Sequence, residues 1–294
     1  LIYYQSSINL NPLFPPSYNN YGKALLDLKR FADSLKYFDQ ALILDPQYIE
    51  CLNNKGIALK ELRQLKESLK CIQLAFEIKN DDPKTLTNLG VVLSAQKKYE
   101  ESIIFFESAI RADPGCAEAW SNKASTYIEL KKLQDALYCF EQTLSLKSDF
   151  EWSVGNFLFT RLKLGIWNDY DHYLNKIFSG IITQQKIVKP FICLVLTSDS
   201  FLQNTCAEIY SKFLHPLKID FNYNVKNLDT RKIKLAYFSA DFGSHAVSSL
   251  LAEFLELRDK NLFEIIAFSF SNDDGSSMYS RIVNSFDEFI VVEN

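Results

Sequence analysis

Small and large apolar residues recur along the first half of the chain with a fixed period. Gly22, Gly56, Gly90 and Ala124 form one column of this repeat, and a large apolar residue stands four residues before and three residues after each of them. Three further columns follow at constant spacing: Ser34, Ser68, Ser102 and Ala136; Phe38, Ile72, Phe106 and Phe140; and Ala41, Ala75, Ala109 and Thr143. Small residues let two helices approach and large residues fill the space between them, so each period predicts a pair of packed helices.

A 34-residue period of paired helices resembles the tetratricopeptide repeat. Asp45-Pro46 ends the first period, because proline cannot continue a helix, and Pro83 suits the first turn of the helix that opens the third. Neighbouring hairpins stack, since none buries its apolar face alone, and we expect a right-handed superhelix with a concave inner face. The four predicted repeats are residues 15–48, 49–82, 83–116 and 117–150.

Beyond residue 150 the small-residue columns end, because Leu158, Tyr170 and Ile177 occupy positions where a further repeat would have small side chains. We expect a helical transition segment over residues 151–215, with Asp199 or Ser200 as the N-cap of its last helix. The expected helices are 151–164, 169–180, 189–196 and 200–214. Residues 216–230 are rich in Asn, Asp and Lys and predict a linker.

The last part of the chain, residues 231–294, changes to short apolar runs separated by polar loops. The predicted strands are 232–239, 263–270 and 288–292, and the predicted helices between them are 246–258 and 278–286. We expect parallel strands joined by right-handed connections, with the first strand buried on both faces. The fold prediction is therefore an α-helical tetratricopeptide superhelix followed by the start of an α/β, Rossmann-like domain. Its first loop has one glycine, Gly243, where a dinucleotide-binding loop needs three, so a dehydrogenase is disfavoured.

Composition narrows the class of partner. The net charge of −4 and the pI of about 5.6 leave no basic excess for a phosphate backbone, which argues against nucleic acid. Six scattered cysteines form no C-x-x-C pair, so they indicate reduced thiols, no zinc site and a cytoplasmic location. No apolar run reaches the roughly 18 residues of a membrane span. Because the chain begins at Leu1 and stops just after an apolar run, we expect both ends to be cut.

A polar column lies two residues before the small one and consists of Asn20, Asn54, Asn88 and Asn122. A carboxamide offers two hydrogen-bond donors and an acceptor, so a row of four on the concave face suits the backbone of an extended polypeptide. We therefore predict that this column binds a polypeptide. The alternative is that asparagine is common at this repeat position and serves the geometry of the hairpin.

The stretch Lys232 to Ser249 joins the first predicted strand to a polar loop and then to a helix. Open α/β sheets bind ligands at the carboxyl ends of their strands, where this loop lies. His245 stands at the start of the helix, where the backbone dipole helps to keep imidazole neutral, as a base or a hydrogen-bond partner must be. We predict His245 as the catalytic residue, and we expect His172 and His215 to be surface or packing residues.

From Arg231 to Ser276 the chain closely resembles the start of the catalytic region of the O-linked N-acetylglucosamine transferases and SPINDLY-like glycosyltransferases, which also carry tetratricopeptide repeats before it. The resemblance implies a glycosyltransferase domain of the GT-B type, whose loop histidine near the acceptor and the donor sugar matches His245. Animal members have proline after that histidine and a second histidine four residues on, where this chain has Ala246 and Ser249.

The resemblance also implies a reaction. A serine or threonine hydroxyl attacks the anomeric carbon of a nucleotide sugar, and the diphosphate leaves toward helix N-termini and basic side chains. The family binds the donor mostly through a second Rossmann-like half, and we expect residues 231–294 to hold only part of the first half, so the chain alone is expected to be inactive. No metal or other cofactor is implied. UDP-N-acetylglucosamine is the donor of most members, and GDP-fucose is that of plant SPINDLY proteins.

Two functions from different classes are compatible with the sequence. The first is a protein O-glycosyltransferase, with N-acetylglucosamine as the expected sugar, whose repeats present an acceptor polypeptide. The second is a scaffold whose repeats bind partner proteins without catalysis. We favour the enzyme, because a polar histidine loop at a strand end has little use in a scaffold, and for neither do we expect nucleic acid or a membrane as partner.

Overall fold

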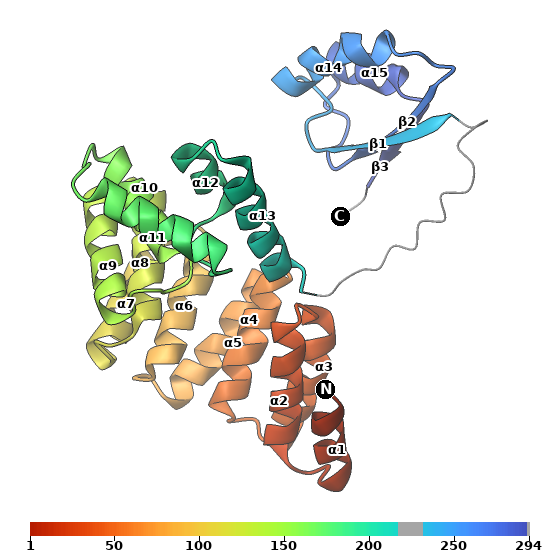
Figure 1. The fold of residues 1–294 in the computed structure, drawn as a ribbon. Coiled ribbons are helices and arrows are strands. Elements are labelled where there is room, and N and C mark those ends of the chain that lie inside the picture. Colours follow the sequence, from red (N-terminus) through yellow and green to blue (C-terminus); the bar gives the residue numbers. More distant parts are fainter. Residues whose placement is uncertain (217–231, 293–294) are drawn as a thin grey trace. The chain divides into compact units, whose positions relative to one another are not determined.

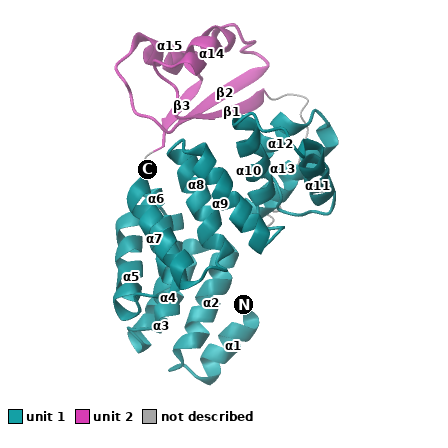
Figure 2. Ribbon diagram, turned by 90° about the vertical axis from the view of Figure 1, so that its left-hand side faces the viewer, with its two compact units in different colours: residues 1–219 teal, residues 220–294 magenta. Residues whose placement is uncertain are grey.

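The computed structural model describes residues 1–216 and 232–292. The chain divides into two compact units, Leu1–Ile219 and Asp220–Asn294, called unit 1 and unit 2 (Figures 1 and 2). Unit 1 is a stack of helices, and unit 2 combines two helices with a parallel sheet. The predicted fold class, a tetratricopeptide superhelix followed by the start of an α/β domain, is thereby confirmed. All but the first residue of the predicted linker, 216–230, lie outside the described residues.

Eight helices of unit 1 form the four predicted hairpins. They are α2 Pro15–Asp27, α3 Phe31–Leu44, α4 Ile49–Glu61, α5 Leu65–Ile78, α6 Pro83–Ala95, α7 Tyr99–Ala112, α8 Ala117–Glu129 and α9 Leu133–Leu146. The small column of each first helix faces the large column of the second, as expected. A Cβ atom on Gly90 would lie 2.5 Å from Cε1 of Phe106, and Gly22 is similarly close to Phe38. The two helices of a hairpin therefore approach at a point where only a very small side chain fits. One further helix, α1 (Ile2–Leu10), precedes the hairpins and was not predicted.

Each hairpin turns at a basic residue in the left-handed backbone region. Lys29, Arg63, Lys97 and Lys131 recur once per repeat, with φ between 59° and 63°. In the first hairpin the amide of Arg30 donates to the carbonyl of Leu25 (2.9 Å) and that of Lys29 to Leu26 (2.9 Å). This is the helix ending that usually carries glycine, so each repeat holds a lysine or arginine in a strained conformation.

Four helices follow the repeats: α10 Ser153–Lys163, α11 Tyr170–Ile182, α12 Pro190–Leu196 and α13 Ser200–Leu214. They share a core that includes Leu158 and Ile177, the large residues that ended the repeat pattern. Asp199 caps α13 as predicted, because its carboxylate accepts from the amides of Phe201 (2.8 Å) and Leu202 (3.3 Å). The transition segment thus has a helical core that continues the packing of α9, since Leu144 packs against it.

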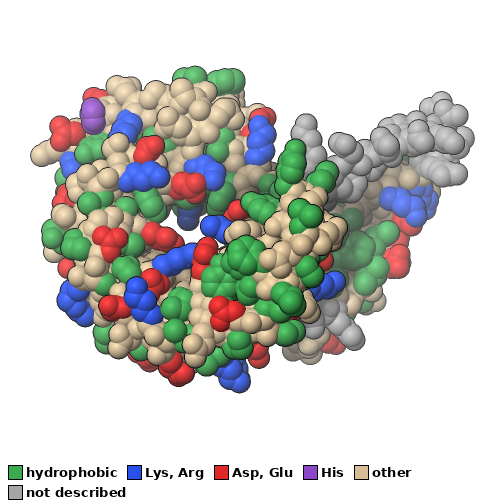
Figure 3. Space-filling model, turned by 90° about the horizontal axis from the view of Figure 1, so that it is seen from below, with side chains coloured by type: hydrophobic (Ala, Val, Ile, Leu, Met, Phe, Trp, Pro, Cys, Tyr) green, Lys and Arg blue, Asp and Glu red, His purple; other side chains and the backbone are tan. Residues whose placement is uncertain are grey.

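The end of α13 returns to the first repeat within unit 1. The Nζ atoms of Lys29 and Lys186 lie 4.6 Å and 4.7 Å from the centre of the Phe213 ring, and Lys186 also pairs with Glu151 at 2.8 Å. A cavity of about 550 Å³ opens beside this contact. Seen from below, unit 1 surrounds a hollow whose rim carries side chains of both charges (Figure 3).

Unit 2 is a three-stranded parallel sheet with strand order β1-β2-β3. Its elements are β1 Ile233–Ser239, α14 Ala246–Glu256, β2 Phe263–Ser269, α15 Ser277–Ser285 and β3 Glu288–Val291. The register pairs Ile233 with Phe263 and Ile266 with Glu288. Both helices cover the same face of the sheet (Figure 1), where the core residues Leu255, Ile265 and Ile282 lie buried. The connections β1-α14-β2 and β2-α15-β3 run in the same direction across the sheet, and connections of the same handedness then place both helices on the same face.

The prediction that β1 is buried on both faces is wrong. Phe238 is 64% exposed and stacks on Phe268 with ring centres 4.7 Å apart, on the face opposite the helices. The apolar run of β1 suggested cover on both sides, but in the described part of unit 2 α14 and α15 share one face and β1 lies at the edge of the sheet.

Candidate functional site

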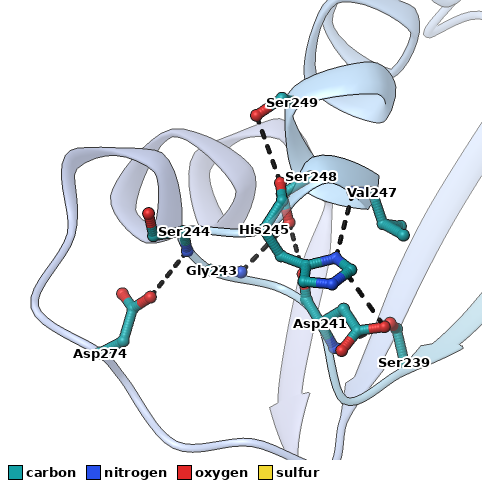
Figure 4. A network of polar contacts seen from close by, with 9 residues as sticks. All are labelled: Ser239, Asp241, Gly243, Ser244, His245, Val247, Ser248, Ser249 and Asp274. Atoms are coloured by element: carbon teal, nitrogen blue, oxygen red, sulfur yellow. Dashed lines mark hydrogen bonds and ion pairs between the residues drawn. The ribbon is translucent and has the colours of Figure 1, made fainter.

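The loop between β1 and α14, at the carboxyl end of β1, is tied together by serine hydroxyls (Figure 4). Ser239, the last residue of β1, accepts a hydrogen bond from the amide of Asp241 at 3.0 Å. Ser248, buried in α14, donates to the carbonyl of Asp241 (2.6 Å) and accepts from the amide of Gly243 (3.1 Å). Phe242 is buried among the aromatic residues of the core. The Ser248 hydroxyl therefore holds the loop to α14, and the Phe242 ring holds it to the core of unit 2.

His245 is the N-cap of α14, as its position in the sequence predicted. Its Nδ1 accepts a hydrogen bond from the amide of Val247 at 3.2 Å, and the carboxylate of Asp241 lies 4.0 Å from the same nitrogen (Figure 4). A nitrogen that accepts carries no proton, so the neutral ring holds its proton on Nε2. The His245 side chain is 51% exposed. The arrangement thus offers a fixed N–H donor to a ligand at the carboxyl end of β1.

Asp274, in the loop between β2 and α15, joins this site and was not predicted. Its Oδ2 accepts from the amide of Ser244 at 2.7 Å, and its Oδ1 accepts from the amide of Ser276 at 2.9 Å. A Cβ atom on Gly243 would lie 2.5 Å from Oδ2, so the glycine makes room for the carboxylate. Hydrogen bonds from Ser276 and Ser244 lower the pKa of Asp274 below its ordinary value of 3.8. Asp274 therefore connects the two loops at the carboxyl edge of the sheet.

The four predicted asparagines stand one on each first helix, α2, α4, α6 and α8, and differ in exposure. Asn20 is exposed and Asn122 half-buried, whereas Asn54 and Asn88 are buried. Nδ2 of Asn54 donates to Oδ1 of Asn19 at 3.0 Å, and Nδ2 of Asn88 donates to Oδ1 of Asn53 at 2.9 Å, each in the preceding repeat. Two members of the column therefore link adjacent repeats, and binding of a polypeptide by the column stays a prediction.

The other predicted groups have simpler surroundings. His172 and His215 are both exposed, and His215 ends α13. Within residues 1–216 and 232–292, no cluster of three or more His, Cys, Asp or Glu side chains has the arrangement of a metal site. Among the same residues, no helix has the length and apolar character needed to cross a membrane.

By its fold, the chain is a stack of tetratricopeptide-type hairpins followed by an α/β unit whose first loop carries a half-exposed histidine. Models of the tetratricopeptide repeat match residues 15–48, 49–82, 83–116 and 117–150, and the model of glycosyl transferase family 41 matches residues 199–294. The resemblance drawn from residues 231–276 is confirmed: this is a repeat protein similar to the O-linked N-acetylglucosamine transferases.

Individual proteins similar to this chain match only part of it or of their own length. The UDP-N-acetylglucosamine–peptide N-acetylglucosaminyltransferase of Caenorhabditis elegans is 24% identical over 142 residues, which are 42% of this chain and 12% of that protein. The match thus spans about an eighth of the relative's length. Among solved structures, the pilF protein of Pseudomonas aeruginosa has 18% identity and a TM-score of 0.54, covering 69% of this chain and 92% of its own, and shows the shared repeat fold. A Thermobaculum terrenum O-GlcNAc transferase variant has 16% identity and a TM-score of 0.44, covering 83% of this chain and 41% of its own.

Proposed function

We propose that the complete protein is a protein O-glycosyltransferase that moves N-acetylglucosamine from UDP-N-acetylglucosamine to serine or threonine of polypeptides presented by the repeats. One observation carries the proposal. The segment that matches glycosyl transferase family 41 contains a loop that holds a half-exposed histidine at the carboxyl end of a parallel strand, where α/β sheets bind ligands. We place the reaction in the cytoplasm, because all six cysteines are free thiols, as is typical of reducing compartments.

His245 is proposed to orient a substrate oxygen. With Nδ1 engaged by the amide of Val247, the Nε2–H group is available to donate to a sugar or acceptor oxygen. General-base catalysis through Nε2 requires the other tautomer, in which the hydrogen bond to Val247 is lost. The geometry therefore supports an orienting donor better than a base.

Acceptor binding is proposed for the concave surface of the repeats. Asn20 and Asn122 are the members of the asparagine column that are not buried. Asn54 and Asn88 each use one N–H group inside the stack. Substitution of Asn20 and Asn122 should weaken polypeptide binding without loss of stability, whereas substitution of Asn54 and Asn88 should lower both.

Residues 1–294 alone are proposed to be inactive, because the family's donor site lies mostly in a second Rossmann-like half. We expect no sugar transfer and no tight binding of UDP by this chain. Isothermal titration calorimetry checks the second point, and a micromolar dissociation constant would contradict it.

The test uses the complete protein with UDP-N-acetylglucosamine or GDP-fucose, and intact-protein mass spectrometry to detect sugar addition. His245→Ala should lower turnover by roughly 10²-fold, the usual effect of losing an orienting or acid/base group. It should lower stability by only about 1 kcal/mol, the cost of the lost N-cap hydrogen bond to Val247. His172→Ala is the matched control, since that ring is exposed in unit 1. Transfer with normal turnover in His245→Ala would refute the role of the histidine alone. Failure of both donors would favour the scaffold.

A further inference from the structure

Helix α1 has the sequence register of a second repeat helix, although it precedes the four repeats. Its residues stand one full repeat period before those of α3, with apolar, large and small side chains in the same order. The matched pairs are Leu1 and Leu35, Tyr3 and Tyr37, Tyr4 and Phe38, Ser7 and Ala41, Ile8 and Leu42, Asn11 and Asp45, and Pro12 and Pro46. Asn11-Pro12 thus stands where Asp45-Pro46 and Asp113-Pro114 end the first and third repeats.

The backbone agrees with this register. Asn11 ends α1 with φ −141° and ψ 86°, and Asp45 and Asp113 end α3 and α7 with φ −140° and ψ of 93° and 97°. Ser7 contacts the following helix through a hydroxyl pair with Ser17 at 2.7 Å. Helix α1 therefore meets α2 as the second helix of one repeat meets the first helix of the next.

Burial differs between the two ends of α1. Ile8, which faces α2, is buried. Tyr4 is 40% exposed and Tyr3 89% exposed, whereas Phe106, in the column of Tyr4, is 1% exposed. In the complete hairpins this column lies against the glycine of the first helix. The exposed apolar residues thus lie at the start of α1, where the first helix of the same repeat would cover Tyr4.

We propose that the exposed surface at the start of α1, formed by Leu1, Tyr3 and Tyr4 and called the α1 face, docks an amphipathic helix of the first-helix type, with glycine or alanine opposite Tyr4. The argument is continuity, because the same face of α3, α5, α7 and α9 is filled by such a helix in each hairpin. A second copy of the chain fits poorly. Two α1 faces would set Tyr4 against Tyr4, where the hairpins require a small residue.

The first experiment adds a first-type helix to the start of the chain, at the spacing that it has in the repeats. A copy of residues 49–68 is placed before Leu1, so that α4 and its turn lead into α1 at the position where Leu69 follows Ser68. We expect the melting temperature of the extended chain to rise by about 5–10 °C, the effect of a few newly buried side chains in a domain of this size. The same extension with Gly56→Leu in the copy should give little or no rise.

Two variants show whether the gain arises at the α1 face. Tyr4→Ala should remove most of the gain in the extended chain and change the unextended chain by only about 1–2 °C. Ile2→Ala should leave the gain intact, because Ile2 lies in the outward column of Lys36 and Lys70. An equal gain with Gly56→Leu in the copy, or with Tyr4→Ala, would overturn the proposal. So would a dimer of the unextended chain, seen by sedimentation equilibrium and dissociated by Tyr4→Asp.

Discussion

The repeats and unit 2 are stabilised in different ways. In the repeats each important contact has counterparts in the neighbouring hairpins: the approach of Gly90 to Phe106 recurs as Gly22 to Phe38 and as Gly56 to Ile72. In unit 2 the important polar contacts occur once. A lost side chain in the repeats therefore weakens one of several similar interfaces, whereas a lost side chain in unit 2 removes a contact without a substitute.

Arg258 is the clearest single contact of unit 2. Its side chain is only 6% exposed; Nη1 donates to the carbonyls of Leu255 (2.8 Å) and Ser285 (2.6 Å), and Nη2 pairs with Asp287 at 2.8 Å. A hydrogen bond from the amide of Ile265, together with Arg258, lowers the pKa of Asp287. One guanidinium thus joins α14, α15 and the segment that leads into β3.

The two regions can be observed separately. All three tryptophans, Trp120, Trp152 and Trp167, lie in unit 1. Tryptophan fluorescence therefore reports the unfolding of the helical unit, and hydrogen exchange of residues 232–292 reports unit 2. The predictions below use this division.

The largest effect is expected for Phe106→Ala in α7. Removal of a fully buried ring leaves a cavity against Gly90 and should lower the free energy of unfolding of unit 1 by about 4 kcal/mol. Urea denaturation followed by tryptophan fluorescence measures it. Ile104→Ala, in the same helix but exposed, should change stability by less than about 0.5 kcal/mol, and equal losses in the two variants would refute the packing argument.

Arg258→Met should destabilise unit 2 by about 2 kcal/mol, because two carbonyls and the Asp287 carboxylate lose their partner. Hydrogen exchange of residues 232–292 should accelerate while the tryptophan transition of unit 1 stays unchanged. The control is Arg281→Met, which removes an exposed pair with Glu256 and should leave exchange nearly as it was. A shift of the tryptophan transition would contradict the separation of the two regions.

Asp274→Ala should loosen the His245 loop with little effect on the rest of unit 2. We expect the amide of Ser244 to exchange roughly fivefold faster, as for the loss of one solvent-exposed hydrogen bond, whereas Asp273→Ala, which affects only the bond to Gly275, should not change it. Because its folded pKa is lowered, the contribution of Asp274 is present above pH 3.8 and lost as pH falls through the folded value. Unchanged exchange at Ser244 would show that the carboxylate does not hold the loop.

The smallest effect is expected for Lys131→Gly, at the left-handed turn between α8 and α9. Glycine adopts φ of 59° without steric cost, so stability should rise by about 0.5–1 kcal/mol after the entropy cost of glycine in the unfolded chain. Lys132→Gly, one residue on at φ −88°, relieves no strain and should lower stability. A rise in both variants, measured by urea denaturation, would exclude turn strain as the cause.

The sequence predicted the elements well where a side chain acts within one repeat or one turn. The helix expected at 200–214 is Ser200–Leu214 with the expected cap, and His245 begins α14. Asp274 was missed because its partner, Ser244, lies 30 residues away and no local pattern marks a contact between two loops. The exposed face of β1 was missed because an apolar run reports which side chains are apolar and says nothing of how many neighbours cover them.

The asparagine column shows a second limit of the repeat pattern. Asn54 and Asn88 were correctly identified as members of a column, but their use inside the stack depends on Asn19 and Asn53 of the preceding repeat. A period reveals that a position matters in every repeat. It does not distinguish a side chain that binds a ligand from one that binds the next repeat, because both recur with the same spacing.

The position of β1 at the edge of the sheet also affects how the protein behaves in solution. In the described part of unit 2, β1 has a paired strand on one side only, and Phe238 is exposed on the face away from the helices. Unpaired backbone groups beside exposed apolar side chains recruit strands from other molecules, and Lys234 is the one charged side chain within this strand. At high concentration, preparations of residues 1–294 should therefore self-associate through intermolecular β-pairing before the helical unit melts.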